Sequence, residues 1–138
     1  MIVVDASVLS NALADDGESG KEARRELRAA NRLAAPDLID VETVAVLRKR
    51  WLARTLSEEQ FATALGDLAR LEFERVPTLR LMPRAFELRS NVTPYDACYV
   101  ALAEALGGEL LTADRRLANA AGPRCAVRLL GRAAGTSA

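Results

Sequence analysis

Short aliphatic runs alternate with longer amphipathic segments along this chain, and polar residues or prolines close most of the runs. The runs with strand character lie at residues 2–4, 33–35, 73–76, 109–112 and 126–130. The segments between them have the length and apolar periodicity of helices. Strands that alternate with helices pair in parallel, so the pattern predicts an α/β fold with three α/β/α layers and a mainly parallel central sheet.

Capping residues predict several helix boundaries. Asp37 is a candidate N-cap for the long helix that follows it. Ser57 and Gln60 have the spacing of a capping box, and Thr93 followed by Pro94 is typical of a helix start. Helices are expected at residues 7–14, 20–30, 38–54, 57–71, 94–106 and 114–120, with a further helix that has Pro83 near its first turn.

The composition suits one globular domain. With 138 residues and 50% hydrophobic content, the chain can bury roughly two thirds of the surface that it exposes when unfolded. We expect the domain to span residues 1–130. A disordered tail is expected at residues 131–138, because that segment is small and polar.

Charge and cysteine usage limit the function classes. Lys plus Arg and Asp plus Glu are each 19, which argues against a general polycationic surface for nucleic acids. Nearly all of the positive charge is arginine, which is suited to forked contacts with phosphate. Cys98 and Cys125 form no CxxC pair, so neither a zinc knuckle nor a disulfide framework is indicated. Apolar runs of membrane length are absent from the sequence, and we expect a cytoplasmic protein without a membrane partner.

Four acids lie where apolar runs give way to turns or to the first turns of helices, namely Asp5, Glu42, Asp96 and Asp114. In a parallel α/β sheet these places share the edge formed by the carboxyl ends of the strands. Taken singly, each acid has an ordinary explanation as a helix cap, a turn residue or a charge at the positive end of a helix. Taken together, they predict a site for Mg²⁺ or Mn²⁺, because buried carboxylates need a partner and hard cations prefer oxygen ligands. Zinc is disfavoured, because the chain has no histidine.

Two hydroxyls and two arginines accompany the acids. Ser7 and Thr112 each lie two residues from an acid and are expected to orient a carboxylate or a water, although ordinary backbone capping explains them nearly as well. Arg115 and Arg116 follow Asp114 directly. We expect them to steer a phosphate backbone toward the acids, with solvated surface arginines as the alternative.

A basic cluster, Arg48, Lys49, Arg50 and Arg54, belongs to the long helix that carries Glu42. The cluster surrounds the helix, so some of its members must face water or a partner while others can contact RNA. Trp51 within it is suited either to stacking on a base or to packing at an interface. The apolar stripe of the same helix is expected at Leu38, Val41, Ala45 and Leu52.

Four pieces of the sequence occur in a distinctive order. They are residues 3–7, Glu42 on a helix after Pro36, residues 93–97 and residues 111–115. Their order and spacing resemble the PIN-domain ribonucleases, in particular the VapC-type toxins of bacterial toxin–antitoxin pairs. The resemblance covers nearly the whole chain, about residues 1–130.

The resemblance implies a PIN fold, an acidic Mg²⁺ or Mn²⁺ site, and endonucleolytic hydrolysis of structured RNA such as tRNA or rRNA by metal-activated water. It also implies a homodimer held inactive by a cognate antitoxin. The acidic quartet of such proteins corresponds here to Asp5, Glu42, Asp96 and Asp114, and their supporting polar residues correspond to Ser7 and Thr112. Residues 115–117 depart from the pattern, because some relatives carry a further acid there. This departure leaves the occupancy of a second metal position open.

Two other functions remain open at this point. Another metal-dependent phosphohydrolase could use Asp5 as a covalent nucleophile. Aspartate phosphatases that resemble the haloacid dehalogenases have a second acid two residues after the nucleophile, whereas this chain has Ser7 there. A PIN-like module that binds RNA or protein without cutting is the non-enzymatic alternative. Four buried or half-buried acids are costly, which disfavours a module that has no use for them.

Overall fold

The structure is a computed structural model and describes residues 1–131. Its elements are β1 (Ile2–Val4), α1 (Ala6–Ala14), α2 (Glu18–Ala29), β2 (Leu33–Pro36), α3 (Ile39–Leu52), α4 (Glu58–Arg70), β3 (Glu74–Val76), the 3-10 helix η1 (Thr78–Leu81), α5 (Met82–Glu87), α6 (Pro94–Leu106), β4 (Glu109–Thr112), α7 (Arg115–Ala118) and β5 (Val127–Leu129). The predicted disordered tail, apart from Gly131, lies outside the described residues. Within residues 1–131, no helix is long and apolar enough to cross a membrane.

The central sheet has five strands in the order β3-β2-β1-β4-β5, and every pairing is parallel. The predicted α/β class and parallel sheet are therefore confirmed. Strand β1 is in the middle, where Ile2 pairs with Leu33 on one side and Val4 pairs with Leu111 on the other. A central strand is covered on both faces, which explains why its sequence is an unbroken aliphatic run.

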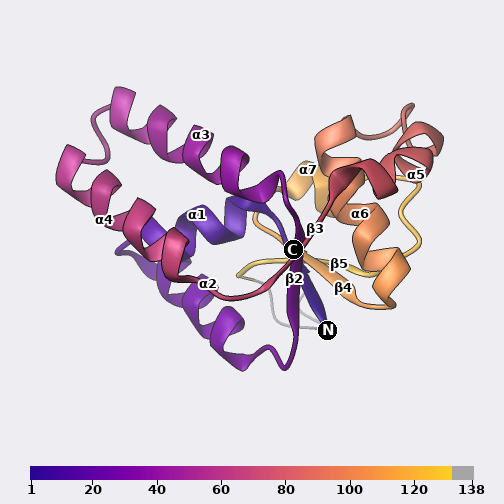
Figure 1. Ribbon diagram of the computed structural model, residues 1–138, viewed down its shortest axis with the longest axis horizontal. Coiled ribbons are helices and arrows are strands. Elements are labelled where there is room, and N and C mark those ends of the chain that lie inside the picture. Colours follow the sequence, from indigo (N-terminus) through magenta and orange to yellow (C-terminus); the bar gives the residue numbers. More distant parts are fainter. Residues whose placement is uncertain (132–138) are drawn as a thin grey trace.

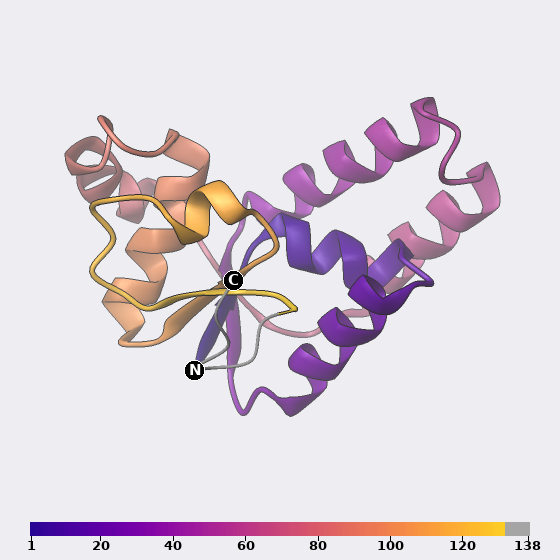
Figure 2. The same ribbon diagram turned by 180° about the vertical axis from the view of Figure 1, so that it is seen from behind.

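Helices cover both faces of the sheet and form the two outer layers (Figures 1 and 2). Helices α1, α2, α3 and α4 lie on one side, and α5 and α6 lie on the other. Helix α1 contacts α2, α3 and α4, whereas α6 contacts β1, β2 and β4. Helices α3 and α4 run side by side and extend away from the sheet (Figure 1).

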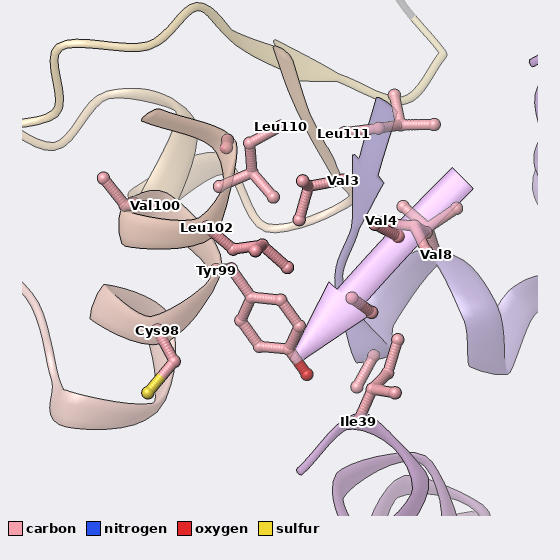
Figure 3. Packing of buried hydrophobic residues seen from close by; sticks show 14 of the residues in the cluster. Val3, Val4, Val8, Ile39, Cys98, Tyr99, Val100, Leu102, Leu110 and Leu111 are labelled. Carbon is pink, nitrogen blue, oxygen red and sulfur yellow. The ribbon is translucent and has the colours of Figure 1, made fainter. Parts of the chain in front are cut away.

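The core lies between β1, β4 and α6. Val3, Val4 and Leu110 are completely buried, and Tyr99 of α6 is 1% exposed. Figure 3 shows the Tyr99 ring projecting from α6 into this core, with its hydroxyl oxygen directed toward Ile39 of α3. The core is mostly aliphatic, as a chain with 4% aromatic residues requires. Tyr99 is the exception that carries a polar atom toward the edge of the sheet.

Several predicted helix ends are confirmed. The Ser57–Gln60 capping box is complete, and the Thr93 hydroxyl accepts a hydrogen bond from the Asp96 N–H. Helix α6 ends at Gly107, whose φ of 64° lies in the left-handed region that favours glycine. At Gly108 a side chain would clash with Met1, since a Cβ there would lie 2.8 Å from the Met1 carbonyl oxygen. Helix α2 begins at Glu18, two residues before the predicted start.

Two predictions for the long helix are wrong. Helix α3 begins at Ile39 after Leu38, and no side chain caps it, so Asp37 is not its N-cap. Its buried face consists of Ile39, Thr43 and Leu47 rather than the predicted stripe, and Val41 is 74% exposed. Apolar residues occur all round this helix, so periodicity alone does not identify the face that packs against α1 and α4.

Candidate active site

The four predicted acids line one pocket with a volume of about 320 Å³. Asp5 directly follows β1, Asp114 is the second residue after β4, and Glu42 and Asp96 lie in the first turns of α3 and α6. The pocket is therefore at the carboxyl edge of the parallel sheet, between helices from its two outer layers. The structure brings all four acids together as the sequence analysis expected, whereas their chemical role stays a prediction.

Asp5 is the most buried of these acids, with 5% of its surface exposed. Its Oδ1 accepts hydrogen bonds from the Ser7 hydroxyl at 2.5 Å and from the Val8 N–H at 3.2 Å. Its Oδ2 accepts one from the Thr112 hydroxyl at 2.5 Å. These bonds fix the carboxylate in one orientation. Asp5 is also the N-cap of α1, so the same carboxylate both caps a helix and lines the pocket.

Ser7 and Thr112 connect Asp5 to the loop that carries Asp114. The Ser7 Oγ accepts a hydrogen bond from the Ala113 N–H at 2.9 Å, and the Thr112 Oγ1 accepts one from the Asp114 N–H at 3.0 Å. Each hydroxyl thus donates to Asp5 and accepts from a backbone amide. Removing the Thr112 hydroxyl would leave two polar groups without that partner, a cost of about 1–3 kcal/mol for each one left buried and unpaired.

Glu42 is held by a residue whose role the sequence analysis missed. The Tyr99 hydroxyl donates a hydrogen bond of 2.6 Å to the Glu42 Oε1, and this joins α6 to α3 across the pocket. Burial and the hydrogen bond to Glu42 raise the pKa of Tyr99 far above its usual range, so the phenol stays protonated and donates. The Tyr99 ring itself belongs to the buried face of α6. Its spacing of three residues from Asp96 is the signal that it also faces the pocket.

Asp96 and Asp114 differ in how far capping explains them. Among residues 1–131 the Thr93 N–H donates no hydrogen bond to the Asp96 carboxylate, in contrast to the complete Ser57–Gln60 box. Capping therefore does not account for that carboxylate. Asp114 does cap a helix, because its Oδ1 accepts from the Arg116 N–H at 2.9 Å. It lines the pocket as well.

Three of the carboxyl groups have raised pKa values, with burial as the largest cause in each. For Asp5, burial outweighs the opposing hydrogen bonds from Ser7 and Thr112, and the charge of Asp96 raises the pKa further. For Glu42, the charges of Asp96 and Asp5 add to burial, while the hydrogen bond from Tyr99 opposes them. For Asp96, the charge of Asp114 adds to burial. The acids therefore repel one another when ionised, and a nearby cation would relieve that repulsion.

The donor set of the pocket fits a hard divalent cation. Within residues 1–131, no Lys or Arg forms a salt bridge with Asp5, Glu42 or Asp96, and the charge of Arg116 offsets the raised pKa of Asp96 only in part. Carboxylate oxygens without nitrogen or sulfur ligands are the set that Mg²⁺ or Mn²⁺ prefers. As the side chains stand in this part of the chain, no three acids, cysteines or histidines are arranged to hold an ion. Binding by several acids at once thus requires their side chains to turn.

The predicted basic residues are separated by the structure. Lys49 lines the pocket of the four acids. Arg116 lies on the other side of Asp114, where its Nε is 3.7 Å from the Asp114 Oδ1 and its side chain is 93% exposed. Arg115 is exposed. Arg50 is engaged elsewhere, because it donates a hydrogen bond of 2.6 Å to the Asn11 Oδ1.

Comparison with known families agrees with this architecture. Residues 2–123 match the PIN domain family, so the chain belongs to the PIN-domain proteins and the predicted family is confirmed. The match begins in β1, which leads into Asp5, and extends beyond Asp114. It therefore includes all four acids of the pocket.

Two relatives from Mycobacterium tuberculosis place the chain more narrowly. Ribonuclease VapC9 is 41% identical over 132 residues, which are 96% of this chain and 100% of that protein. Ribonuclease VapC1 is 44% identical over 129 residues, which are 93% of this chain and 96% of that protein. The chain is thus a member of the VapC ribonuclease family.

A solved structure shares the fold. The crystal structure of VapBC2 from Rickettsia felis bound to a DNA fragment from their promoter matches with a TM-score of 0.65. The match covers 94% of this chain and 98% of that chain at 18% identity. At this identity the likeness shows the α/β/α fold alone.

Proposed function

We propose that this protein is a divalent-metal-dependent endoribonuclease and the toxin of a toxin–antitoxin pair. Its membership of the VapC ribonucleases supports the reaction class. The observation that carries the proposal is the convergence of four acids in one pocket. Among residues 1–131, Asp114 pairs with Arg116, whereas Asp5, Glu42 and Asp96 form no salt bridge. The nuclease domain comprises residues 1–130, and the substrate is structured RNA such as tRNA or rRNA in the cytoplasm.

Asp5 and Asp96 are the principal ligands in this proposal, and Glu42 and Asp114 complete the set directly or through water. When bound, Mg²⁺ or Mn²⁺ supplies charge stabilisation for the phosphoryl oxygens and an activated water. Asp5 is already held by two hydroxyls and an amide, so it provides a fixed point. Glu42 is held by one hydrogen bond, from Tyr99, so its carboxylate can turn toward Asp5. In this proposal the Asp96 carboxylate turns toward Asp5 as well.

The environment of Asp5 disfavours covalent catalysis. A carboxylate nucleophile needs an oxygen that faces the phosphorus, but both Asp5 oxygens accept hydroxyl hydrogen bonds and the residue is 5% exposed. We therefore propose that water is the nucleophile. One P–O bond forms to the water oxygen, the bond to the leaving ribose oxygen breaks, and the proton of the water passes to solvent or to the leaving group.

A cognate antitoxin and a second copy of the chain are the proposed protein partners. The match to VapBC2 supports an antitoxin, since that structure is a VapBC complex. The homodimer rests on the family resemblance alone. We propose that the antitoxin keeps the nuclease inactive, as the resemblance implies.

Cleavage by the purified protein tests the proposed function. We expect total tRNA or rRNA to be cut at discrete positions in Mn²⁺ or Mg²⁺, and cutting to fall to the uncatalysed background in excess chelator. Adding the ion back should restore cleavage. Sequencing the new RNA ends would identify the target.

The outcomes also separate the alternatives. Cleavage that persists unchanged in excess chelator would exclude a metal-dependent reaction. Trapping of a phosphoenzyme on Asp5 would support the aspartate phosphohydrolase instead. RNA binding without any cleavage in the presence of either ion would support a non-catalytic module.

A further inference from the structure

A second hollow adjoins the pocket of the four acids. Its volume is about 190 Å³, and it shares Asp96 and Asp114 with the first pocket as common lining residues. Thr93 and Asn91 line it on the side of α6, and Arg116 lines it on the side of α7. We call these two adjoining hollows, which meet at Asp96 and Asp114, the depression.

Each end of this depression has a basic side chain. Lys49 lines the first pocket and Arg116 lines the second, and both are exposed. Among residues 1–131 Lys49 forms no ion pair with an acid. The other lysine of the sequence, Lys21, pairs with Glu18. The order along the depression is thus a cation, the acids and another cation.

The position of Lys49 on α3 follows from helix geometry. Glu42, Val46 and Lys49 are spaced by four and three residues, so they occupy one face, and all three line the pocket. At a rise of 1.5 Å per residue, Lys49 lies about 10 Å along the axis from Glu42. It is therefore set apart from the acids, and the half-buried Val46 lies between them.

We propose that the RNA strand runs along this depression, with Lys49 and Arg116 each binding a phosphate on opposite sides of the scissile phosphate. The inference rests on the proposed function and adds the path of the substrate. Phosphates beside the scissile one need cations at a distance from the acids, because the acids themselves repel every phosphate. The two cations hold the strand in register while the scissile phosphate lies over the acids.

Basic residues of α2 provide matched controls. Lys21, the other lysine of the chain, and Arg28 are both exposed on this helix. Neither lines the two hollows. A general attraction between RNA and positive charge would involve all four residues similarly, whereas the proposed path involves only Lys49 and Arg116.

Steady-state cleavage by five variants tests the path. For Lys49→Ala and Arg116→Ala we expect KM to rise about tenfold each, the scale of one charge-assisted hydrogen bond, with a smaller change in kcat. The slope of log affinity against log salt should fall by about 0.7 for each phosphate contact that is lost. Lys49→Arg should restore most of the affinity. Lys21→Ala and Arg28→Ala should resemble the wild type in both KM and salt slope.

Three results would overturn the inference while leaving the proposed function intact. One is a wild-type enzyme that cleaves RNA while Lys49→Ala and Arg116→Ala keep its KM and salt slope. Another is effects of equal size in Lys21→Ala and Arg28→Ala, which would indicate unspecific attraction. The third is a Lys49→Ala variant that changes Mn²⁺ affinity instead of RNA affinity, since Lys49 would then act on the acids. A wild type that cleaves no RNA would reject the proposed function itself.

Discussion

Replacing Asp5 by Asn is expected to lower the RNA cleavage rate by about a thousandfold or more, on the scale that loss of a key electrostatic group causes in other active sites. The change removes the negative charge at the acid whose two oxygens accept hydrogen bonds from the Ser7 and Thr112 hydroxyls. It should leave the fold intact, because the remaining amide oxygen can still accept the Val8 N–H that caps α1. Asp96→Asn should cause a loss of similar size. Initial cleavage rates at saturating Mn²⁺ measure both effects.

Asp37→Asn is the matched control. Asp37 is exposed near the same edge of the sheet, between β2 and α3, and it does not line the pocket. The same change of chemistry there should leave the cleavage rate within about twofold of the wild type, because surface substitutions away from a site have small effects. An Asp5→Asn protein that is folded and cleaves at the wild-type rate would contradict the assignment of the acids.

Lowering the pH from 7 toward 5 is expected to increase the contribution of the acidic pocket to stability when no divalent ion is present. The folded-state pKa values of Asp5, Glu42 and Asp96 are raised above their ordinary values of 3.8, 4.5 and 3.8. Protonation therefore favours the folded state. This contribution is complete below the ordinary values and is lost as the pH rises through the folded-state pKa values. At neutral pH the three charges remain and destabilise the ion-free protein.

Urea denaturation in chelator at several pH values measures this effect. The comparison must be made with the Glu42→Gln Asp96→Asn protein, because other carboxyl groups respond in the opposite direction. Glu26, for example, has a pKa lowered by its hydrogen bonds with Arg128, so its contribution to the stability of the protein is lost as the pH falls. We expect the double variant to be more stable than the wild type at pH 7 and the difference to shrink toward pH 5. A difference that does not depend on pH would show that the pKa values of Glu42 and Asp96 are not raised in the folded protein.

The location of the acids was predictable because it follows from topology. Asp5 and Asp114 end aliphatic runs, and parallel strands bring such ends to one edge. The Thr93–Pro94 helix start fixed the place of Asp96 in the same way. Each of these signals is local in the sequence and depends on backbone geometry, so the positions predicted from it agree with the structure.

The partners of the acids were not predictable from the same signals. Tyr99 has an apolar ring in the core and a hydroxyl at Glu42, and only the tertiary arrangement of α6 and α3 on the two sides of the pocket brings these two residues together. Lys49 was one of several basic residues on α3. Which of them faces the pocket depends on the rotation of α3, and the wrong apolar stripe shows that periodicity does not set this rotation.

Titration of Mn²⁺ into the chelator-treated protein at pH 7, followed by calorimetry, tests most directly whether these acids together form a cation site. We expect saturable binding to the wild type, an affinity at least about tenfold weaker in both Asp5→Asn and Asp96→Asn, and no change in Asp37→Asn. Equal Mn²⁺ affinity in all four proteins, or no saturable binding to the wild type, would contradict the account.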